Sequence, residues 1–573
     1  MDKQHERDFI VRRVLNRDSL ERVCAAKQVE VSDLTGIAAH FDVSMAPTIG
    51  ALNPLLDQQG ATLDQGAVRL PEAMQPVYRS FCGHGWNGLA CGPAFGGEGL
   101  PHLCHAFLRE TLNGKSLAFG LLHDLNFSFY KALHRHGCDE LKARFLEKVV
   151  AGQCTATMCL TEPNCGTDLS LIQTTARRDP QERLWRLSGN KIFITWGDHD
   201  LTDNIVHLVL ARSGERGSGL AGLSLFLVPK WLEENGSRRP NQVQTLGIEN
   251  KMGIHGSPTC SLAFDGSEGW LVGNEGDGLS CMFTMMNAAR ISVGLQGLGI
   301  AQEAFEKALA YAGERRQGKA AWQRAALPRP PHPIIQHPDI QRRFMDMEAR
   351  ITAARVLVYD ACLLLDLADV TECEREADDV QARLGFYTPV LKYALSELGW
   401  GVANECMQIL GGHGYVHENG IEQLARDIRI ASIYEGTNAI QARDLVQRKL
   451  LKQCARFEEI LDAVAASALR LGRFADFPMQ ARALIDLNGR IKNAASILIE
   501  RMENDDRDVS ADFCGFLEAF YLLLSGSAWA RLLTAANDDG ESPLHQNKIR
   551  IGRFFFDRIL PEADLPITII ETR

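Results

Sequence analysis

The chain has 573 residues, of which 45% are hydrophobic and 23% are charged, and its formal net charge is −11 at pH 7. A chain of this length exceeds what one hydrophobic core supports, so roughly three or four domains are expected. The composition excludes a disordered chain. The acidic balance disfavours a nucleic-acid-binding surface, which needs concentrated Lys and Arg. Any anionic ligand must therefore be held by local groups.

The cysteine content and the N-terminus indicate the compartment. Fifteen cysteines, an odd number without a C-x-x-C pair, are typical of reduced thiols in an intracellular protein rather than of a disulfide framework. The first residues, MDKQHERDFIVRRVL, are too charged for a secretory signal, and no run approaches the roughly 18 consecutive apolar residues of a membrane span. We therefore expect a cytoplasmic enzyme without a membrane span.

The spacing of apolar residues divides the chain into four regions. Residues 1–150 are mostly helical, with apolar residues three and four positions apart. Residues 151–272 contain short β-branched or alternating runs separated by Gly, Asp and Pro, which is typical of antiparallel strands and predicts a small β domain or barrel. Long helical patterns return in residues 273–451, and residues 452–573 add a helical extension without an evident catalytic cluster. The order α, β, α, α predicts the α+β class rather than an alternating βαβ sheet.

Six motifs stand in a characteristic order: "MCLTEPNCGTDLS", "GNKIFIT", "MNAARISVGLQGLG", "YAGERRQGK", "QILGGHGY" and "IYEGTNAIQ". Together they resemble the acyl-CoA dehydrogenase family of flavoproteins, from about Asp57 through Leu450. The C-terminal region, "GDHDLTDNIVHLVLAR" and "NKMGIHGSPTC" are similar to its larger, 3-methylmercaptopropionyl-CoA dehydrogenase-like subgroup. The resemblance implies an N-terminal helical domain (1–150), a middle antiparallel β-barrel domain (151–272), a four-helix-bundle domain (273–451) and an extra C-terminal helical domain (452–573).

The resemblance also implies FAD as the cofactor. It places Thr161 at the pyrimidine edge of the flavin, Phe193 against the ring where many members have tryptophan, and Thr195 near N5. Gln408 to Gly412 would reach the adenosine of FAD bound mainly by a neighbouring subunit, which implies at least a homodimer. The residues implied to bind FAD are Met158, Leu160, Thr161, Gly166, Thr167, Phe193, Ile194, Thr195, Arg315, Gln317, Gln408, Ile409, Gly411, Gly412, Thr437 and Asn438. From the residues alone, a strand-end turn with capping hydroxyls and an ordinary helix cap remain alternatives.

Glu435 lies in "SIYEGTNAIQ", a stretch otherwise free of charge, although Glu-Gly-Thr-Asn is also ordinary turn chemistry. Removal of a proton α to a thioester needs a carboxylate on one face of the carbon and a hydride acceptor on the other. The resemblance implies that Glu435 is this catalytic base, that hydride passes to flavin N5, and that the product is a trans-2-enoyl-CoA. Some members carry the base on the helix immediately before the arginine matched by Arg290, where this chain has Ala289.

Asn287 and Arg290 are three residues apart and therefore share a helix face. Such a pair is commonly a solvated face or an interhelical salt bridge, but the resemblance places both beside the acyl-CoA substrate, with Thr167 and Gly436 also at the substrate. The histidines show no metal-ligand spacing, so structural roles and no metal are predicted. These histidines are His84, His102, His105, His199, His207 and His413.

An electron-transfer flavoprotein is the acceptor that the resemblance implies. An acyl-CoA oxidase remains an alternative, as does a flavin-binding, DNA-associated protein of the same fold that is not a dehydrogenase. The DNA-associated alternative needs a basic C-terminal surface, and acidic residues are mixed among the arginines of Lys452–Arg573. The acyl chain length is not decided by the sequence, although the subgroup favours a short or medium chain.

Overall fold

The computed structural model describes residues 3–180, 184–215, 217–234, 236–318, 331–538 and 542–573. Contacts within the chain define two compact units. Unit 1 comprises Met1–His40, Pro101–Glu110 and Val293–Arg573, and unit 2 comprises Phe41–Leu100 and Thr111–Ser292. The helices whose residues belong to both units are α3 (Val31–Ser44), α6 (His102–Lys115) and α9 (Gly278–Glu314). The bounds of the four domains expected from the sequence stay a prediction.

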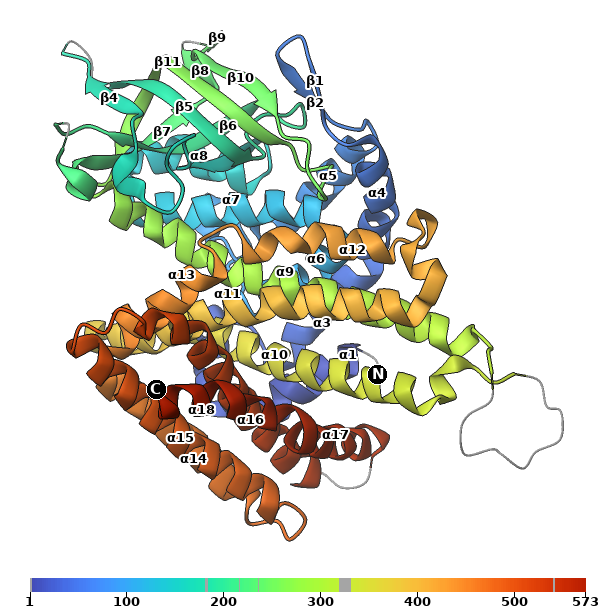
Figure 1. Cartoon of the computed structure of the whole chain (residues 1–573). Helices are drawn as coiled ribbons and strands as arrows, with labels where there is room; N and C mark the ends of the chain where they lie inside the picture. Colours follow the sequence, from blue (N-terminus) through green and yellow to red (C-terminus); the bar gives the residue numbers. More distant parts are fainter. Residues whose placement is uncertain (1–2, 181–183, 216, 235, 319–330, 539–541) are drawn as a thin grey trace. The chain divides into compact units, whose positions relative to one another are not determined.

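Unit 2 contains a seven-stranded sheet that closes on itself (Figure 1). Strand β7 pairs with both β6 and β11, so β11, β5, β4, β6 and β7 form a ring, while β10 pairs with β11 and β3 pairs with β6. The strands of this sheet are β3 (Cys154–Cys159), β4 (Thr175–Arg178), β5 (Trp185–Thr195), β6 (Asn204–Arg212), β7 (Leu223–Pro229), β10 (Val243–Ile248) and β11 (Thr259–Val272). The barrel expected in the middle of the chain is confirmed.

The direction of two strands differs from the antiparallel arrangement expected from the sequence. Strand β3 pairs with β6 in parallel, from Cys154 opposite Asn204 to Cys159 opposite Val209. Strand β4 also meets β6 in parallel, at Thr175 and Arg212. The chain passes through β4 and β5 between β3 and β6, so these strands are not joined by a hairpin and can run in the same direction. Alternation predicts that a strand exists but not the direction of its partner.

The middle strands of the barrel are buried on both faces. On β6, Leu208 and Leu210 pack in a cluster with residues of α7, α8 and β3, whereas Val209 and Ala211 pack in a second cluster with residues of β5, β7 and β11. All nine residues of β6 are buried. The two clusters hold β3 between the helices and the barrel. Strand β3 leads into the motif "MCLTEPNCGTDLS", so the start of this motif is held in place.

The other elements of unit 2 are helices and two short hairpins. Strands β1 and β2 pair antiparallel, as do β8 and β9. The elements are α4 (Ala46–Gln59), β1 (Thr62–Asp64), β2 (Ala67–Arg69), α5 (Met74–Gly83), α7 (Leu117–His136), α8 (Asp139–Val150), β8 (Trp231–Glu234) and β9 (Ser237–Pro240).

Unit 1 is helical, and its longest complete helices have clear start and stop signals. Helix α10 begins with Pro338 and Asp339, both favourable in the first turn of a helix. Helix α11 ends before Gly411, whose φ of 61° lies in the left-handed region. The helices before the extension are α1 (Lys3–Phe9), α2 (Arg17–Lys27), α10 (Pro338–Val370), α11 (Glu374–Leu410), α12 (Ile421–Ile428) and α13 (Asn438–Arg443).

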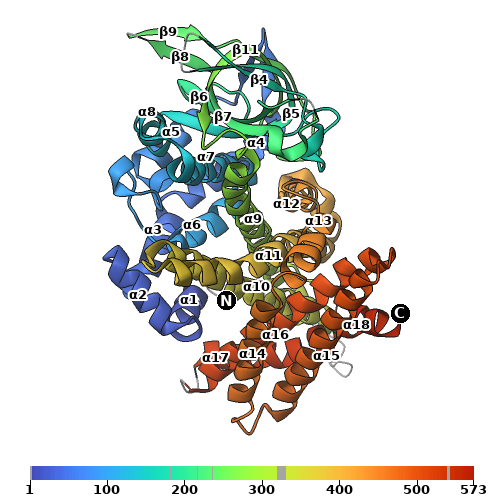
Figure 2. The same cartoon turned by 90° about the vertical axis from the view of Figure 1, so that its left-hand side faces the viewer.

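The C-terminal extension forms a group of helices within unit 1 (Figure 2). These helices are α14 (Cys454–Leu471), α15 (Pro478–Glu503), α16 (Phe513–Asp538), α17 (Pro543–Phe554) and α18 (Asp564–Thr572). By length and composition, the segment Val509–Asp538 could cross a membrane, although no membrane span was predicted from the sequence. Its most apolar window is 72% buried inside the protein, as in the core helix of a folded domain.

Polar side chains join the extension to the rest of unit 1. The Trp529 indole N–H donates to the Ala349 carbonyl at 3.0 Å, and the Tyr393 hydroxyl donates to Glu518 at 2.6 Å. These contacts connect α16 to α10 and α11, so the extension is packed as part of unit 1.

Candidate active site

The first part of the candidate site is the turn that follows β3. Glu162 and Cys165 exchange two backbone hydrogen bonds of 2.9 Å, which close the turn. The Ile192 N–H donates to the Thr161 carbonyl at 2.9 Å and ties the turn to β5. Gly166 is exposed, and a Cβ added there would meet no atom within 4 Å. The turn therefore presents hydroxyls and backbone N–H groups to open space.

A buried ion pair beneath this turn was missed by sequence reasoning. The Lys191 ammonium donates to the Leu160 carbonyl at 2.9 Å and to the Glu162 carboxylate at 2.8 Å. Glu162 also accepts the N–H groups of Gln173 at 2.7 Å and Thr174 at 3.0 Å. Burial would raise the pKa of Glu162, but the Lys191 charge and these hydrogen bonds lower it below its ordinary value. A lysine inside the strand motif "GNKIFIT" was the available signal, because a buried lysine requires a partner.

The second part lies at the end of β5, where the backbone is strained. Phe193 has a φ of 57° and is 58% exposed, while the neighbouring Ile194 is buried. Thr195 pairs with Thr259 of β11. Trp196 also has a positive φ, of 56°, and its indole N–H donates to the Ala118 carbonyl at 3.3 Å. Positive φ in bulky residues is costly and concentrates at functional sites.

These two parts fit the polar edge and the face of a planar cofactor. An exposed aromatic ring beside strand-end hydroxyls offers stacking and hydrogen bonding together. In the structure, Met158, Thr161 and Thr195 are half-buried and Leu160 is buried, while Thr167 is exposed. The residues at the strand ends of unit 2 therefore suit the isoalloxazine ring of FAD. Their individual contacts with FAD stay predictions.

Helix α9 contributes the residues predicted at the acyl-CoA. The Arg290 guanidinium donates to the Asn287 side-chain oxygen at 3.4 Å, as expected for residues that share a helix face. Arg290 is buried, whereas Asn287 is exposed. Ala289, which stands where some relatives carry a base, has no ionisable side chain.

In unit 1, Glu435 lies in a turn between two short helical segments. Its φ is 55°, and Gly436 follows with a φ of 83°. Thr437 then caps α13, because its hydroxyl accepts the Ile440 N–H at 3.4 Å. The Gln441 side chain donates to the carbonyls of Glu435 at 3.2 Å and Gly436 at 3.3 Å. Glutamate rarely adopts the left-handed region. The Thr437 cap and the Gln441 side chain together hold Glu435 in this uncommon conformation.

Hydrogen bonds of Tyr434 and Asn438 fix the ends of this turn. The Tyr434 hydroxyl donates to the Gln296 side chain of α9. Asn438 accepts from the Lys392 ammonium at 2.9 Å and donates to Glu397 at 2.6 Å. The Asn438 amide is thus bonded within unit 1, and its predicted contact with the cofactor stays a prediction. These long-range partners of the turn could not be identified from the sequence.

The remaining residues predicted to bind FAD lie after the end of α9 and at the end of α11. Arg315 and Gln317 follow α9 and are exposed, as are Gln408, Gly411 and Gly412, whereas Ile409 is buried. The Tyr311 hydroxyl and the His413 ring nitrogen Nδ1 are 3.2 Å apart. This contact brings the motifs "YAGERRQGK" and "QILGGHGY" together.

Two of the histidines are buried behind β3. The ring of His199 is 2.7 Å from the Thr155 hydroxyl, and that of His207 is 2.7 Å from the Thr157 hydroxyl. Burial lowers the pKa of each histidine to about 3, so both are neutral at pH 7. In the part of the chain that the structure describes, no group of three or more His, Cys, Asp or Glu could hold a metal ion.

Family models match most of the chain. The N-terminal, middle and C-terminal domains of acyl-CoA dehydrogenase match residues 57–153, 157–267 and 276–451. A further model, described as acetyl-CoA dehydrogenase C-terminal like, matches residues 450–573.

Individual relatives extend over nearly the whole chain. A 3-methylmercaptopropionyl-CoA dehydrogenase of Ruegeria pomeroyi is 35% identical over 97% of this chain and 95% of its own length. A butyryl-CoA dehydrogenase of Syntrophomonas wolfei is 32% identical over 87% of this chain and 84% of its own length. The structure of an acyl-CoA dehydrogenase complexed with FAD from Bacillus anthracis is similar in fold, with a TM-score of 0.75, 21% identity, and coverage of 97% of this chain and 88% of that chain.

Proposed function

This chain belongs to the acyl-CoA dehydrogenase family, and from that premise we propose that it oxidises a short-chain acyl-CoA to the trans-2-enoyl-CoA with Glu435 as base. The family consists of FAD-dependent oxidoreductases that act on acyl-CoA thioesters, so the fold, the enzyme class and the cofactor expected from the sequence are confirmed. The substrate, the mechanism and the residue roles are the proposal.

The conformation of Glu435 is the observation that carries the proposal. A glutamate with a φ of 55° costs about 1–3 kcal/mol in backbone strain. Structural turns avoid that cost by placing glycine or asparagine at such a position. Here glycine follows at the next residue, Gly436, while the strained position itself is occupied by a glutamate. Retention of Glu435 at this cost supports a role in chemistry.

We infer the following division of work among the residues. The Glu435 carboxylate removes the α proton of the thioester, and the Glu435 backbone N–H donates to the thioester carbonyl as negative charge develops there. Gly436 has no side chain and allows the carbonyl to approach the backbone. When bound, FAD supplies the hydride acceptor for the β hydrogen. Asn287 and Arg290 orient the acyl-CoA beside this centre.

The remaining assignments extend the same proposal. The two relatives above are named for 3-methylmercaptopropionyl-CoA and butyryl-CoA, which supports a short acyl chain and a place in fatty acid metabolism. We propose a cytoplasmic homodimer that passes electrons to an electron-transfer flavoprotein. Tyr415 is 85% exposed and Val416 is 44% exposed; both follow the exposed glycines of "QILGGHGY", which supports a subunit contact there.

Anaerobic reduction of the flavin tests the proposal. Acyl-CoAs from butyryl to palmitoyl are added to the FAD-loaded protein, and bleaching of the visible flavin band is followed. Butyryl-CoA should bleach the wild type, and Glu435→Gln should slow bleaching by about 10²–10⁴-fold or more while still binding FAD and acyl-CoA. Glu500→Gln, which alters an exposed carboxylate on α15, is the matched control and should behave as wild type. Rapid bleaching in Glu435→Gln would exclude Glu435 as the base.

A further inference from the structure

A cavity lies in unit 1, apart from the residues assigned to dehydrogenation. Its volume is about 500 Å³, and it is lined by the α1–α2 connection, α10, α11, α14 and α16. The residues that line it include none of those assigned above to FAD or acyl-CoA. The volume falls within the usual range of small-molecule sites. We refer to it as the extension cavity, because helices α14 and α16 of the C-terminal extension form part of its wall.

One part of the cavity wall is aliphatic. Leu357 and Leu364 of α10, Ile460 and Val464 of α14, and Leu524 of α16 line it. Each of these side chains is at most 8% exposed. Such a wall favours an apolar group.

The charged groups of the cavity are predominantly positive. Four arginines, Arg13, Arg383, Arg470 and Arg531, and two aspartates, Asp360 and Asp538, line it. This local excess of positive charge contrasts with the net charge of −11 of the whole chain. A cavity with this balance favours an anion.

One of the two aspartates, Asp360, is already neutralised by an arginine. Arg531 binds Asp360 through both guanidinium nitrogens, with one contact at 3.1 Å. Arg531 also donates to the Val14 carbonyl at 3.4 Å. The Arg531 Nε is buried and has no hydrogen-bond partner among the residues that the structure describes. Asp360 is therefore already paired within the protein.

Arg383 and Tyr387 offer a site for the anionic group. They are four residues apart on α11 and so lie on one helix face. Within the described part of the chain, Arg383 forms no ion pair and the Tyr387 hydroxyl makes no hydrogen bond. Burial and the nearby Asp360 raise the pKa of Tyr387, so its hydroxyl keeps the proton and can donate.

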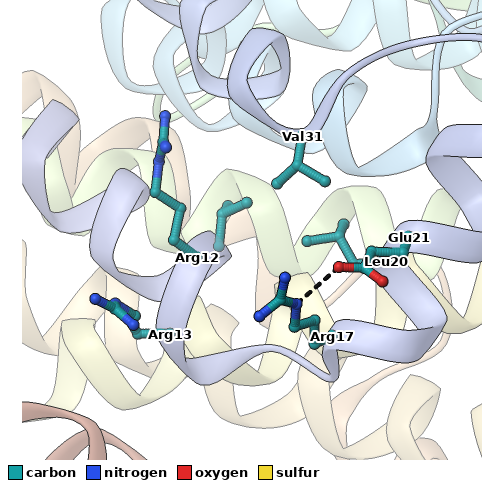
Figure 3. Close-up of a pocket in the computed structure, with 7 residues that line it drawn as sticks. Arg12, Arg13, Arg17, Leu20, Glu21 and Val31 are labelled. Carbon is teal, nitrogen blue, oxygen red and sulfur yellow. Dashed lines mark hydrogen bonds and ion pairs between the residues drawn. The ribbon is translucent and has the colours of Figure 1, made fainter. Parts of the chain in front are cut away.

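A neighbouring pocket also combines arginines with apolar residues and can be compared with the extension cavity. It is lined by Val11, Leu20 and Val31 together with three arginines and Glu21. In Figure 3, Arg17 is directed to Glu21, with which it forms an ion pair of 2.7 Å, and Arg12 points away from this pair. One of the three cations of that pocket is therefore already paired.

We propose that the extension cavity binds a small amphiphilic carboxylate, with the carboxylate at Arg383 and Tyr387 and the aliphatic tail against the leucine-rich wall. An arginine fork and a hydroxyl match the acceptor oxygens of a carboxylate. A divalent cation would need several oxygen ligands, and the cavity has two aspartates, one of which is bound to Arg531. This proposal is independent of the proposed dehydrogenation.

Calorimetric titration of the FAD-loaded full chain with octanoate tests it. Octanoate should bind at one site with the flavin spectrum unchanged, and binding should persist when butyryl-CoA saturates the Glu435→Gln variant. Arg383→Gln should weaken octanoate at least tenfold, as should Ala463→Trp, which fills the cavity from an exposed position in its wall. Arg558→Gln, at an exposed arginine outside the cavity, is the matched control and should bind as wild type.

Neutral and phosphate probes test the head group. Octan-1-ol should bind at least tenfold more weakly than octanoate, and octyl phosphate should not bind more tightly than octanoate. Tighter binding of octyl phosphate would overturn the carboxylate assignment. The proposal fails if octanoate does not bind, if butyryl-CoA displaces it, or if Arg383→Gln and Ala463→Trp leave its affinity unchanged while both variants retain FAD and their helical circular dichroism.

Discussion

Replacement of Lys191 tests whether the buried ion pair holds the turn after β3, where FAD is predicted to bind, in place. Lys191 is fully buried, and its ammonium is shared between the Leu160 carbonyl and the Glu162 carboxylate. Methionine at this position keeps a similar volume but removes the charge. Glu162, which is 5% exposed, would then remain buried with only backbone N–H donors from Gln173 and Thr174.

The size of the effect follows from the burial of Glu162. Removal of one partner from a buried pair costs about 3–5 kcal/mol, because the other charge stays uncompensated. Each kcal/mol lowers the melting temperature of a unit of this size by about 2–4 °C, so Lys191→Met should lower the transition of unit 2 by about 6–20 °C. Calorimetry of the apoprotein measures this shift. FAD retention on gel filtration should fall as well, since Leu160 and Thr161 lose their anchor.

A double substitution separates the ion pair from simple loss of packing. In Lys191→Met/Glu162→Gln no buried charge remains, so most of the lost stability should return. The pH dependence supplies a second readout. Because the folded-state pKa of Glu162 lies below its ordinary value of 4.5, the wild-type pair stabilises the protein above pH 4.5 and loses this contribution at lower pH. A loss under about 1 kcal/mol in Lys191→Met, or a double variant no more stable than the single one, would show that the ion pair does not stabilise this turn.

Two further predictions concern backbone strain and acid stability. Phe193→Gly should be more stable than Phe193→Ala by about 1–2 kcal/mol in thermal unfolding of the apoproteins, because alanine keeps a Cβ at a positive φ; equal stability would contradict the strain at this position. Burial would raise the pKa of Glu6, but Lys548 and Arg355 hold it at about 2. Burial would likewise raise the pKa of Glu110, but Arg355 and Arg7 hold it at about 2. Their stabilisation is therefore complete above the ordinary value of 4.5 and is lost as pH falls toward 2; a helical circular dichroism midpoint in urea that stays constant over this range would contradict it.

The turn at Glu435 could be predicted because its signals are local. The charge-free flanks, the glycine at 436 and the cap at Thr437 lie within a few residues of one another, and the structure has Thr437 at the N-cap of α13. The start of α10 and the end of α11 were predictable for the same reason, since Pro338 marks the first and Gly411 the second. What these short stretches could not reveal is which distant groups hold Glu435, such as the Gln296 that binds its neighbour Tyr434.

The ion pair beneath the turn after β3 depends on tertiary structure. Lys191 and Glu162 are 29 residues apart, and they meet because β5 passes beside the end of β3. The parallel direction of β3 and β6 is equally non-local, since it follows from the route of the chain through β4 and β5. A lysine in an apolar strand predicts that a partner exists. The identity of that partner requires the register of strands that are distant in sequence.

The C-terminal extension shows the same limit most clearly, because the sequence predicted it only as an extra helical domain. Lys548 of α17 binds Glu6 of α1, which is 542 residues away in the chain, and Arg355 of α10 binds the same carboxylate. All three side chains are at most 7% exposed. Loss of residues 452–573 would remove one of the two cations that hold Glu6 and would uncover the α10 surface where Trp529 binds the Ala349 carbonyl. A buried carboxylate that loses a cation is costly, so the N-terminal helix, the α10–α11 pair and the extension depend on one another for stability, and the wall of the extension cavity exists only when all three are folded.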